Sequence, residues 1–348
     1  MENITSTPLI DETIKINLFY AILVAVVCFL TVIGNSATIY AFWKVPGLRE
    51  KPSEFLILNL SVADLMTGLL AIPLVSPMYI TPGNWPLGES GCRFIVFPFN
   101  LSIHTSLGLL LAISIDRFLL VYLEYPKYLK IQSQARINFI IACCWGFAAL
   151  TVVIEQSVWD VAKGLDEVAA NINYDRVCLS PPRRLQSFSI SFFLGLYFTP
   201  VVLVCGFSLA FLCLLRKRLI KNKVRQAPQS TTGTVSSAPS HENQPQPDQS
   251  ATGGSQGESR SRVRNRYIKP ALSLIALVFG MAVCMLPYSL YVIIIELFCP
   301  KCNNIPVLFN LLFLQFCNAC LDPFLYALTQ RKIQKLYCSC LKGRSAQA

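Results

Sequence analysis

Ionisable side chains that lie within or beside long apolar segments are the groups of this chain that could do chemistry. Asp116, Arg117 and Phe118 stand where one apolar segment ends, and two further acids, Asp64 and Asp322, lie inside other segments. An ionised side chain at a bilayer centre costs about 2.5–3.5 kcal/mol, so such groups persist where they are paired, hydrated or functional. Taken alone, the Asp116–Arg117 pair is equally compatible with two charges that reach the membrane interface.

Hydroxyl and amide groups accompany the two buried acids at a similar depth. Ser106 lies midway along the third apolar segment, and Asn318 precedes Asp322 by one helical turn in the last segment. Two buried carboxylates need a shared proton, amides, water or a cation, and hard cations prefer oxygen ligands. The residues favour a hydrated Na⁺ held by Asp64, Ser106, Asn318 and Asp322. A protonated Asp64 in a hydrogen-bonded network is the alternative.

No set of residues with the composition of an enzyme active site is apparent. The chain has two histidines, His104 in the third apolar segment and His241 in a polar segment far along the chain. We therefore expect no enzymatic activity and no cofactor, with Na⁺ as an allosteric ion at most.

The elements that must position these groups are seven long apolar segments. Hydrophobic residues make up 53% of the chain and charged residues 14%, unlike an average soluble domain. Each segment has the ~20 residues that a helix needs to cross a bilayer, and backbone groups in lipid must pair within a helix. The predicted spans are residues 16–43, 55–79, 94–122, 137–158, 188–215, 267–297 and 305–328. The sequence thus predicts an all-α membrane protein, a seven-transmembrane helix bundle over residues 16–328.

The distribution of basic residues predicts the orientation of the bundle. With residues 1–15 as an extracellular N-terminus, most of the 30 Lys and Arg fall on the cytoplasmic side. This is the positive-inside distribution. The net charge of +11 therefore reflects topology and attraction to anionic lipid of the inner leaflet. Binding to nucleic acid is not expected, because the charge is divided among loops.

Two segments differ from the spans in composition. Residues 222–262 are rich in Ser, Gln, Pro and Gly and have few aliphatic residues, which predicts a disordered third cytoplasmic loop. Residues 329–348 predict a short amphipathic eighth helix and a cytoplasmic tail. In that tail Cys338 and Cys340 are candidates for lipidation, with unmodified thiols as the alternative. Asn3, in Asn3-Ile4-Thr5, is a candidate for glycosylation.

The fourteen cysteines divide by location rather than forming one framework. Those within spans are interpreted as buried packing residues. Cys92 and Cys178 both lie on the predicted extracellular side, which predicts a disulfide that holds the second outer loop over the mouth of the bundle. Cys299 and Cys302 would allow a second bridge within a short loop.

Together these features resemble the rhodopsin-like (class A) family of G-protein-coupled receptors over nearly the whole chain. Each mark is weak alone, but their order and spacing are specific. The stretch 85–159 is most similar to amine receptors of the histamine and muscarinic kind. The marks are Asn35, Asp64, Trp85-Pro86-Leu87-Gly88, Cys92, Asp116-Arg117-Phe118, Trp145, Cys178, Pro200, Pro287 and Asp322-Pro323-Phe324-Leu325-Tyr326.

The resemblance implies a signalling switch at the plasma membrane. Ligand binding would move the sixth span outward around Pro287, free Arg117 from Asp116 and open a cytoplasmic groove for a heterotrimeric G protein. Similarity to histamine-like receptors suggests an inhibitory G protein by analogy, and arrestin and membrane lipids are further partners. The residues of the switch would be Asp116, Arg117, Phe118, Pro287, Pro323 and Tyr326.

The predicted ligand cavity departs from the amine-receptor pattern. Phe99 occupies the position of the amine-binding aspartate, and Phe316 that of the retinal-binding lysine, so neither ligand chemistry is expected. The remaining lining is mostly apolar, which suits an unknown small extracellular ligand of apolar, aromatic or lipid-like character. There are two alternatives to a small apolar ligand. The aromatic residues pack against one another without a ligand, or the ligand is a peptide that binds at the mouth of the cavity. The predicted lining residues are Phe99, Asn100, Ile103, His104, Phe192, Leu196, Met285, Tyr288, Gln315 and Phe316.

The predicted switch departs from the family pattern as well. Met281 and Met285 replace aromatic residues of the sixth span, Tyr267 replaces an acid that holds the arginine, and Ser208 replaces a tyrosine of the fifth span. These changes suggest a weakened resting lock, with either appreciable ligand-free signalling or poor signalling. An atypical receptor that does not couple, acting as a scavenger or dimer partner, is the alternative. A transporter is less favoured, because the two halves show no internal repeat.

Overall fold

The computed structural model describes residues 7–45, 48, 50–123, 125–178, 180–225, 269–299 and 304–329. Every regular element within these ranges is helical. Several predictions concern other residues and lie outside the described ranges. These are the glycosylation site Asn3, the cysteines Cys302, Cys338 and Cys340, the loop over 226–262, and the amphipathic eighth helix with the tail over 330–348.

Seven helical stretches are long and apolar enough to cross a membrane, which confirms the predicted fold class. Two of them are built from several consecutive helices. The membrane-length helices are α1 (Thr7–Lys44), α3 (Glu54–Met66) with η1 (Thr67–Ala71) and α4 (Ile72–Val75), α6 (Gly88–Tyr122), α8 (Gln134–Ser157), α11 (Gln186–Phe193) with η3 (Leu194–Phe198) and α12 (Thr199–Arg225), α14 (Lys269–Phe298) and α15 (Ile305–Thr329).

Local sequence explains why two of the spans are interrupted. The wider π-helical turns Thr67–Ala71 and Leu194–Phe198 each end shortly before a proline, Pro73 and Pro200. Proline has no N–H and its ring clashes with the carbonyl four residues earlier, so the helix widens there instead of breaking. The Thr199 hydroxyl donates to the carbonyl of Leu194 at 2.7 Å and satisfies a backbone group in that turn. Such turns are tolerated at membrane depth because the backbone groups find other partners.

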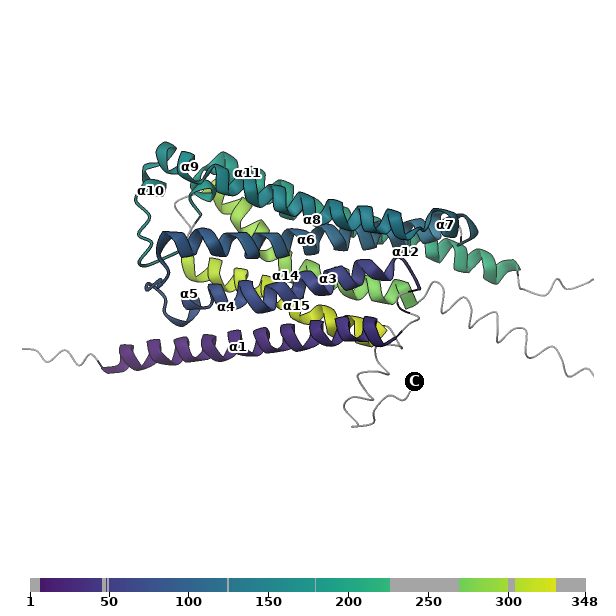
Figure 1. Ribbon diagram of the computed structural model, residues 1–348, viewed down its shortest axis with the longest axis horizontal. Coiled ribbons are helices and arrows are strands. Elements are labelled where there is room, and N and C mark those ends of the chain that lie inside the picture. Colours follow the sequence, from purple (N-terminus) through teal and green to yellow (C-terminus); the bar gives the residue numbers. More distant parts are fainter. Residues whose placement is uncertain are drawn as a thin grey trace, which may run out of the picture.

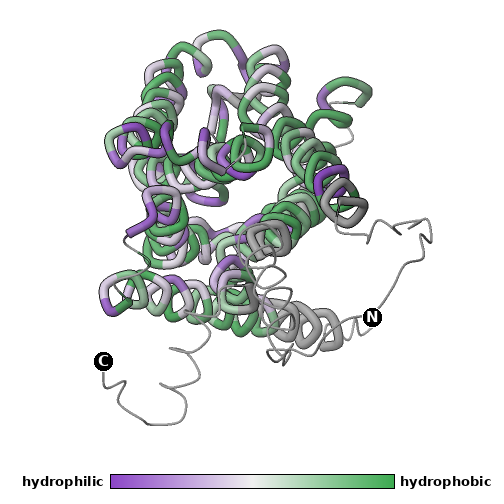
Figure 2. The backbone as a smooth tube through the Cα atoms, turned by 90° about the vertical axis from the view of Figure 1, so that its right-hand side faces the viewer, coloured by the Kyte–Doolittle hydropathy of each residue, from purple (hydrophilic) through white to green (hydrophobic). Residues whose placement is uncertain are grey.

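The long helices lie side by side, with α6 running through the middle of the bundle (Figure 1). The most apolar stretch of α6 is 72% buried, against 22% in α1 and in α8. It packs against α3, α8 and α12. Seen along the bundle, most of each helix is hydrophobic (Figure 2). Large apolar side chains such as Phe29, Phe139 and Phe279 face outward, as expected where the surroundings are lipid.

Close approach of helices stabilises such a bundle, because lipid provides no hydrophobic driving force between them. Gly34 on α1 lies against Pro323 on α15, where a Cβ at residue 34 would be 2.9 Å from the proline ring. The side chain of Asn35 donates to the carbonyl of Ala319 at 2.9 Å and joins the same two helices. The first and last spans are therefore held together by a small residue and a buried amide.

Short helices cover the two ends of the bundle. α9 and α10 lie at the end predicted to be extracellular, here called the outer end, and α7 lies at the opposite, inner end (Figure 1). The Trp159 indole and the Lys163 ammonium donate to Glu89 on α6, and Arg93 on α6 pairs with Asp160, which holds α9 on the top of α6. The short helices are α5 (Pro77–Ile80), α7 (Tyr125–Ile131), α9 (Trp159–Leu165), α10 (Glu167–Ala170) and η2 (Pro181–Arg184).

Several helices begin or end beyond the predicted limits of the spans, and α1 and α12 extend furthest. α1 begins at Thr7, within the range 1–15 predicted as the N-terminus. α12 continues to Arg225 and takes in residues 222–225 of the range predicted as the third loop. The end of α12 from Leu214 to Arg225 contains several Leu, Lys and Arg residues, which favour helix, so the helix continues past the hydrocarbon.

Candidate functional site

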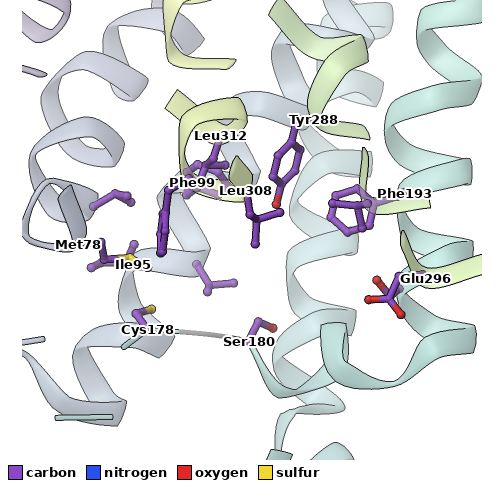
Figure 3. Close-up of a pocket in the computed structure, with 15 residues that line it drawn as sticks. Met78, Ile95, Phe99, Cys178, Ser180, Phe193, Tyr288, Glu296, Leu308 and Leu312 are labelled. Carbon is purple, nitrogen blue, oxygen red and sulfur yellow. The ribbon is translucent and has the colours of Figure 1, made fainter. Parts of the chain in front are cut away.

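A cavity of about 160 Å³ lies at the outer end of the bundle. The side chains of Phe99 on α6 and Leu308 on α15 and the hydroxyl of Tyr288 on α14 point into it (Figure 3). Its polar points are few, and the acid Glu296 stands at one side. The lining residues are Val75, Met78, Ile95, Val96, Phe99, Cys178, Ser180, Ser189, Phe193, Tyr288, Val292, Glu296, Leu308, Phe309 and Leu312.

The cavity lies about one helical turn nearer the outer end than the sequence predicted. Phe99 and Tyr288 are the two predicted residues that line it. Aromatic rings occupy the deeper layer, where Phe316 meets Phe99 edge-on with ring centroids 5.7 Å apart. The other predicted residues are Asn100, Ile103, His104, Phe192, Leu196, Met285, Gln315 and Phe316, and these do not line the cavity.

The second outer loop forms one wall of the cavity. The predicted disulfide between Cys92 and Cys178 is present and joins α6 to this loop, with Cα atoms 5.2 Å apart. The backbone N–H of Trp85 donates to the carbonyl of Asp175 at 2.8 Å, which links the loop to the turn before α6. Cys178 itself lines the cavity. Cys299 is also disulfide-bonded, whereas its predicted partner belongs to the undescribed segment 300–303.

Two predicted polar points, Asn100 and His104, face α8 rather than the cavity. The Asn100 amide donates to the Glu155 carboxylate, which is fully buried. One turn away, the His104 ring lies 2.8 Å from the Thr151 hydroxyl. Ser180 of the outer loop donates to the other Glu155 oxygen at 2.6 Å. Glu155 therefore anchors the cavity wall from inside the bundle.

The four residues predicted to hold Na⁺ are all buried, each at most 3% exposed. The Ser106 hydroxyl donates to Asp64 at 3.0 Å. The second Asp64 oxygen, both Asp322 oxygens and the Asn318 carbonyl oxygen have no hydrogen-bond donor among the described groups. Ionised carboxylates cannot donate to each other, so this oxygen-rich set fits a hard cation. A proton shared between Asp64 and Asp322 fits the same geometry.

A buried ion cluster lies at the inner end of α6. The Arg117 guanidinium is 3.5 Å from Asp116 and 3.9 Å from Glu54 at the start of α3. Asp116 also accepts from the Tyr128 hydroxyl at 2.9 Å and from the Gln132 amide at 3.2 Å. Burial, followed by the charge of Asp116, raises the pKa of Tyr128 above its usual range, so its hydroxyl stays a donor. In this arrangement the Arg117 guanidinium is paired with two acids, Asp116 and Glu54.

The other predicted switch residues lie outside this ion cluster. Phe118 packs on α12, its ring edge-on to Phe207 with centroids 5.6 Å apart. Pro287 lies inside α14 and Pro323 inside α15. Tyr326 is completely buried on the same helix as Pro323.

Sequence reasoning did not single out Glu54, Tyr128 or Gln132. Glu54 carries a signal that could have been used, because it is an acid directly before an apolar run at the inner end. Tyr128 and Gln132 stand four residues apart in a basic loop, and nothing in their spacing relative to Asp116 predicts contact. The turn that brings them back to α6 is visible only in the fold.

Comparison with known proteins agrees with this architecture. Residues 34–326 match the family described as 7 transmembrane receptor (rhodopsin family). Similar proteins include an Allatostatin-A receptor of Bombyx mori, 28% identical over 53% of this chain and 49% of the relative. A 5-hydroxytryptamine receptor 2B of Dichotomyctere fluviatilis is 28% identical over 75% of this chain and 55% of the relative. The Adenosine receptor A2a of Homo sapiens is 24% identical over 95% of this chain and 72% of the relative.

The chain spans about half the length of the first two relatives. The relatives include an amine receptor, in line with the predicted resemblance. The matched family is one of receptors, which confirms the expectation that the chain is not an enzyme. With seven spans and a match over most of its length, the chain is a multi-pass membrane protein that belongs to the rhodopsin family of seven-transmembrane receptors.

Proposed function

We propose that the chain is a plasma-membrane receptor, with its N-terminus extracellular, that transmits the binding of an extracellular ligand to a heterotrimeric G protein. One observation carries this proposal. The single helix α6 contributes Ile95 and Phe99 to the outer cavity and Asp116 and Arg117 to the inner ion cluster. A change in packing at one end of α6 therefore has a direct route to the charges at the other end.

The mechanism is a shift between two states of the bundle. In the described state Arg117 is held by Asp116 and Glu54. In the signalling state α14 moves outward around Pro287, Arg117 is released, and a groove opens for the G protein. A ligand favours that state only by its difference in affinity for the two states. Tyr288, the residue that follows Pro287 on α14, lines the cavity and is placed to sense the ligand.

We infer that the ligand is small and mostly apolar or aromatic, with few polar groups. The cavity of about 160 Å³ is smaller than the roughly 300–1,000 Å³ typical of drug-sized sites. Its hydrogen-bonding groups are Ser180, Ser189, Tyr288 and Glu296. Phe99 provides an aromatic face where an amine receptor has an acid. These features support an apolar contact rather than an ion pair at this point.

We also propose that Asp64, Ser106, Asn318 and Asp322 hold a sodium ion. The ion would supply the positive charge that balances two buried carboxylates. Ser106 orients Asp64 by its hydrogen bond of 3.0 Å. The cluster joins α3, α6 and α15, so an ion bound there would favour the arrangement of helices in which these groups converge.

The test is nucleotide exchange on purified G proteins of each class, with the full-length chain in lipid bilayers. We expect exchange above that of empty bilayers, beginning with the inhibitory class, and its loss in Arg117→Ala. Lys130→Ala, an exposed lysine on α7, removes a nearby positive charge without touching the ion cluster and serves as the control. Absence of exchange with every class would favour a receptor that does not couple and would refute the proposal.

A further inference from the structure

A second cavity, of about 220 Å³, lies at the inner end of the bundle between α3, α6 and α8. Two small residues, Gly108 and Ala112, stand one turn apart on α6 in its lining, and Gly108 lies against Cys144 on α8. The walls are otherwise apolar, with side chains such as Leu111 and Ile140. The polar lining residues are Asp116, Gln132 and Arg136. The cavity is therefore amphipathic and separate from the outer cavity.

The charge available at this cavity is positive. Arg136 is exposed and donates to the carbonyl of Ile131 at 3.4 Å, and no acid pairs with it among the described residues. The carboxylate of Asp116 is occupied by Arg117, Tyr128 and Gln132. An anion that approached the cavity would therefore meet one unneutralised guanidinium rather than a balanced pair.

We propose that this cavity binds a phospholipid of the cytoplasmic leaflet that carries an anionic headgroup. The phosphate would accept hydrogen bonds from the Arg136 guanidinium, whose fork of N–H donors matches phosphate oxygens. Part of an acyl chain would fill the apolar space beside Leu111 and Ile140. The neighbouring face of α8 is open to lipid, since Phe139 is 70% exposed. The cytoplasmic leaflet supplies anionic headgroups at this depth.

A lipid at this place would act on the ion cluster through Gln132. This side chain lines the cavity and also donates to Asp116 at 3.2 Å. A phosphate oxygen that turns the Gln132 amide toward the lipid would remove one of the donors that hold Asp116. Asp116 is then less fixed beside Arg117, which favours the release of Arg117. This second step rests on the proposed coupling function, whereas the binding step does not.

The binding step is tested by native mass spectrometry of the full-length chain in micelles that contain phosphatidylserine or phosphatidylcholine. We expect the wild type to retain phosphatidylserine in preference to phosphatidylcholine. Arg136→Gln should reduce that preference about fivefold, the factor for one basic residue at a membrane surface. Lys127→Gln removes an exposed cytoplasmic charge from α7 and should leave the preference unchanged.

A second variant tests the apolar part of the site. Ala112→Phe places a ring in the cavity and should reduce the retention of phosphatidylserine while Arg136 is intact. Equal retention by wild type, Arg136→Gln and Ala112→Phe would overturn the proposal. Displacement of phosphatidylserine by cholesterol, with no effect of Arg136→Gln, would assign the cavity to a sterol and would overturn it as well.

The coupling step has its own readout. Raising the phosphatidylserine content of the bilayer should increase ligand-free nucleotide exchange by the wild type. The same change should not alter the exchange by the Arg136→Gln variant. A decrease in the wild type would overturn the proposed direction of the effect. Failure of all exchange would count against the receptor function and leave the binding measurement intact, so the two proposals fail separately.

Discussion

At the scale of single residues, the environment of each buried charge decides its role. Asp116 and Arg117 neutralise each other at the inner end of α6, while Glu155 accepts hydrogen bonds from Asn100 and Ser180 near the outer end. Both arrangements meet the requirement that a buried charge be paired or hydrogen-bonded. The two arrangements differ in whether a helix movement can release the charged group. The Arg117 cluster is open to release by a helix movement, whereas Glu155 is enclosed on all sides.

Glu54 is a second acid beside Arg117, 3.9 Å from its guanidinium. Glu54→Gln removes one of the two acids that hold Arg117 and should raise ligand-free nucleotide exchange. A contribution of about 1 kcal/mol from such a pair corresponds to about a fivefold change. Glu50→Gln, which changes an exposed acid at the same end, is the control and should leave exchange at the wild-type level. Unchanged exchange in Glu54→Gln would show that Asp116 alone holds Arg117.

The proposed sodium site of Asp64, Ser106, Asn318 and Asp322 predicts an effect of sodium salts on stability. Sodium chloride should raise the thermal stability of the purified chain above that in choline chloride at equal ionic strength, because the ion binds only the folded bundle. Asp64→Asn should remove the difference, and Glu167→Gln, an exposed acid at the outer end, should keep it. Equal stability in the two salts, together with a dependence on pH, would favour the shared proton over the ion.

At the scale of elements, small residues and prolines set the paths of the helices. Widened turns precede Pro73 and Pro200 in the second and fifth spans near the outer cavity. Gly34 lets α1 approach α15 at Pro323. Because helices in lipid associate by close packing and not by the hydrophobic effect, such contacts contribute directly to stability.

Gly34→Ala tests the approach of α1 to α15. The added methyl would stand 2.9 Å from the Pro323 ring, so one helix must shift, at a cost of about 1–3 kcal/mol. The thermal unfolding temperature in detergent should fall. Gly146→Ala on α8 is the matched control, because its methyl meets nothing within 4 Å. It should gain about 0.5–1 kcal/mol from the better helix propensity of alanine. Equal effects of the two variants would contradict the packing argument.

At the scale of the whole molecule, the two ends of the bundle carry different sites, and α6 contributes residues to both. The outer end carries the cavity and a loop held by a disulfide, and the inner end carries the ion cluster and an amphipathic cavity. The disulfide ties residues 86 positions apart, so it restricts the unfolded chain more than a local bridge would.

The double variant Cys92→Ser with Cys178→Ser tests this restraint on the whole chain. Loss of the bridge should cost about 2–4 kcal/mol and lower both thermal stability and the amount of protein at the cell surface. Cys143→Ser, at an exposed free cysteine of α8, should leave both quantities unchanged. A double variant as stable as the wild type would mean that the loop is held by its other contacts, including Trp85 and Ser180.

The sequence by itself determined the number of spans, the fold class and the cysteines that pair across the outer end. These properties depend on quantities that act locally along the chain. The thickness of the hydrocarbon sets the length of an apolar run, and the cost of unpaired backbone groups makes each run a helix. The order of motifs such as Asp116-Arg117-Phe118 was enough to indicate the family.

The tertiary structure alone decided which other side chains meet, beyond the Cys92–Cys178 pair and the Asp64–Ser106 contact. The spans are apolar on all sides, so their sequences do not show which face turns inward, and the rotation of each helix follows from packing against its neighbours. For this reason Asn100 and His104 were expected in the cavity and instead face α8. For the same reason the contacts of Glu54 with Arg117 and of Gln132 with Asp116, which join separate elements, could not be read from spacing along the chain.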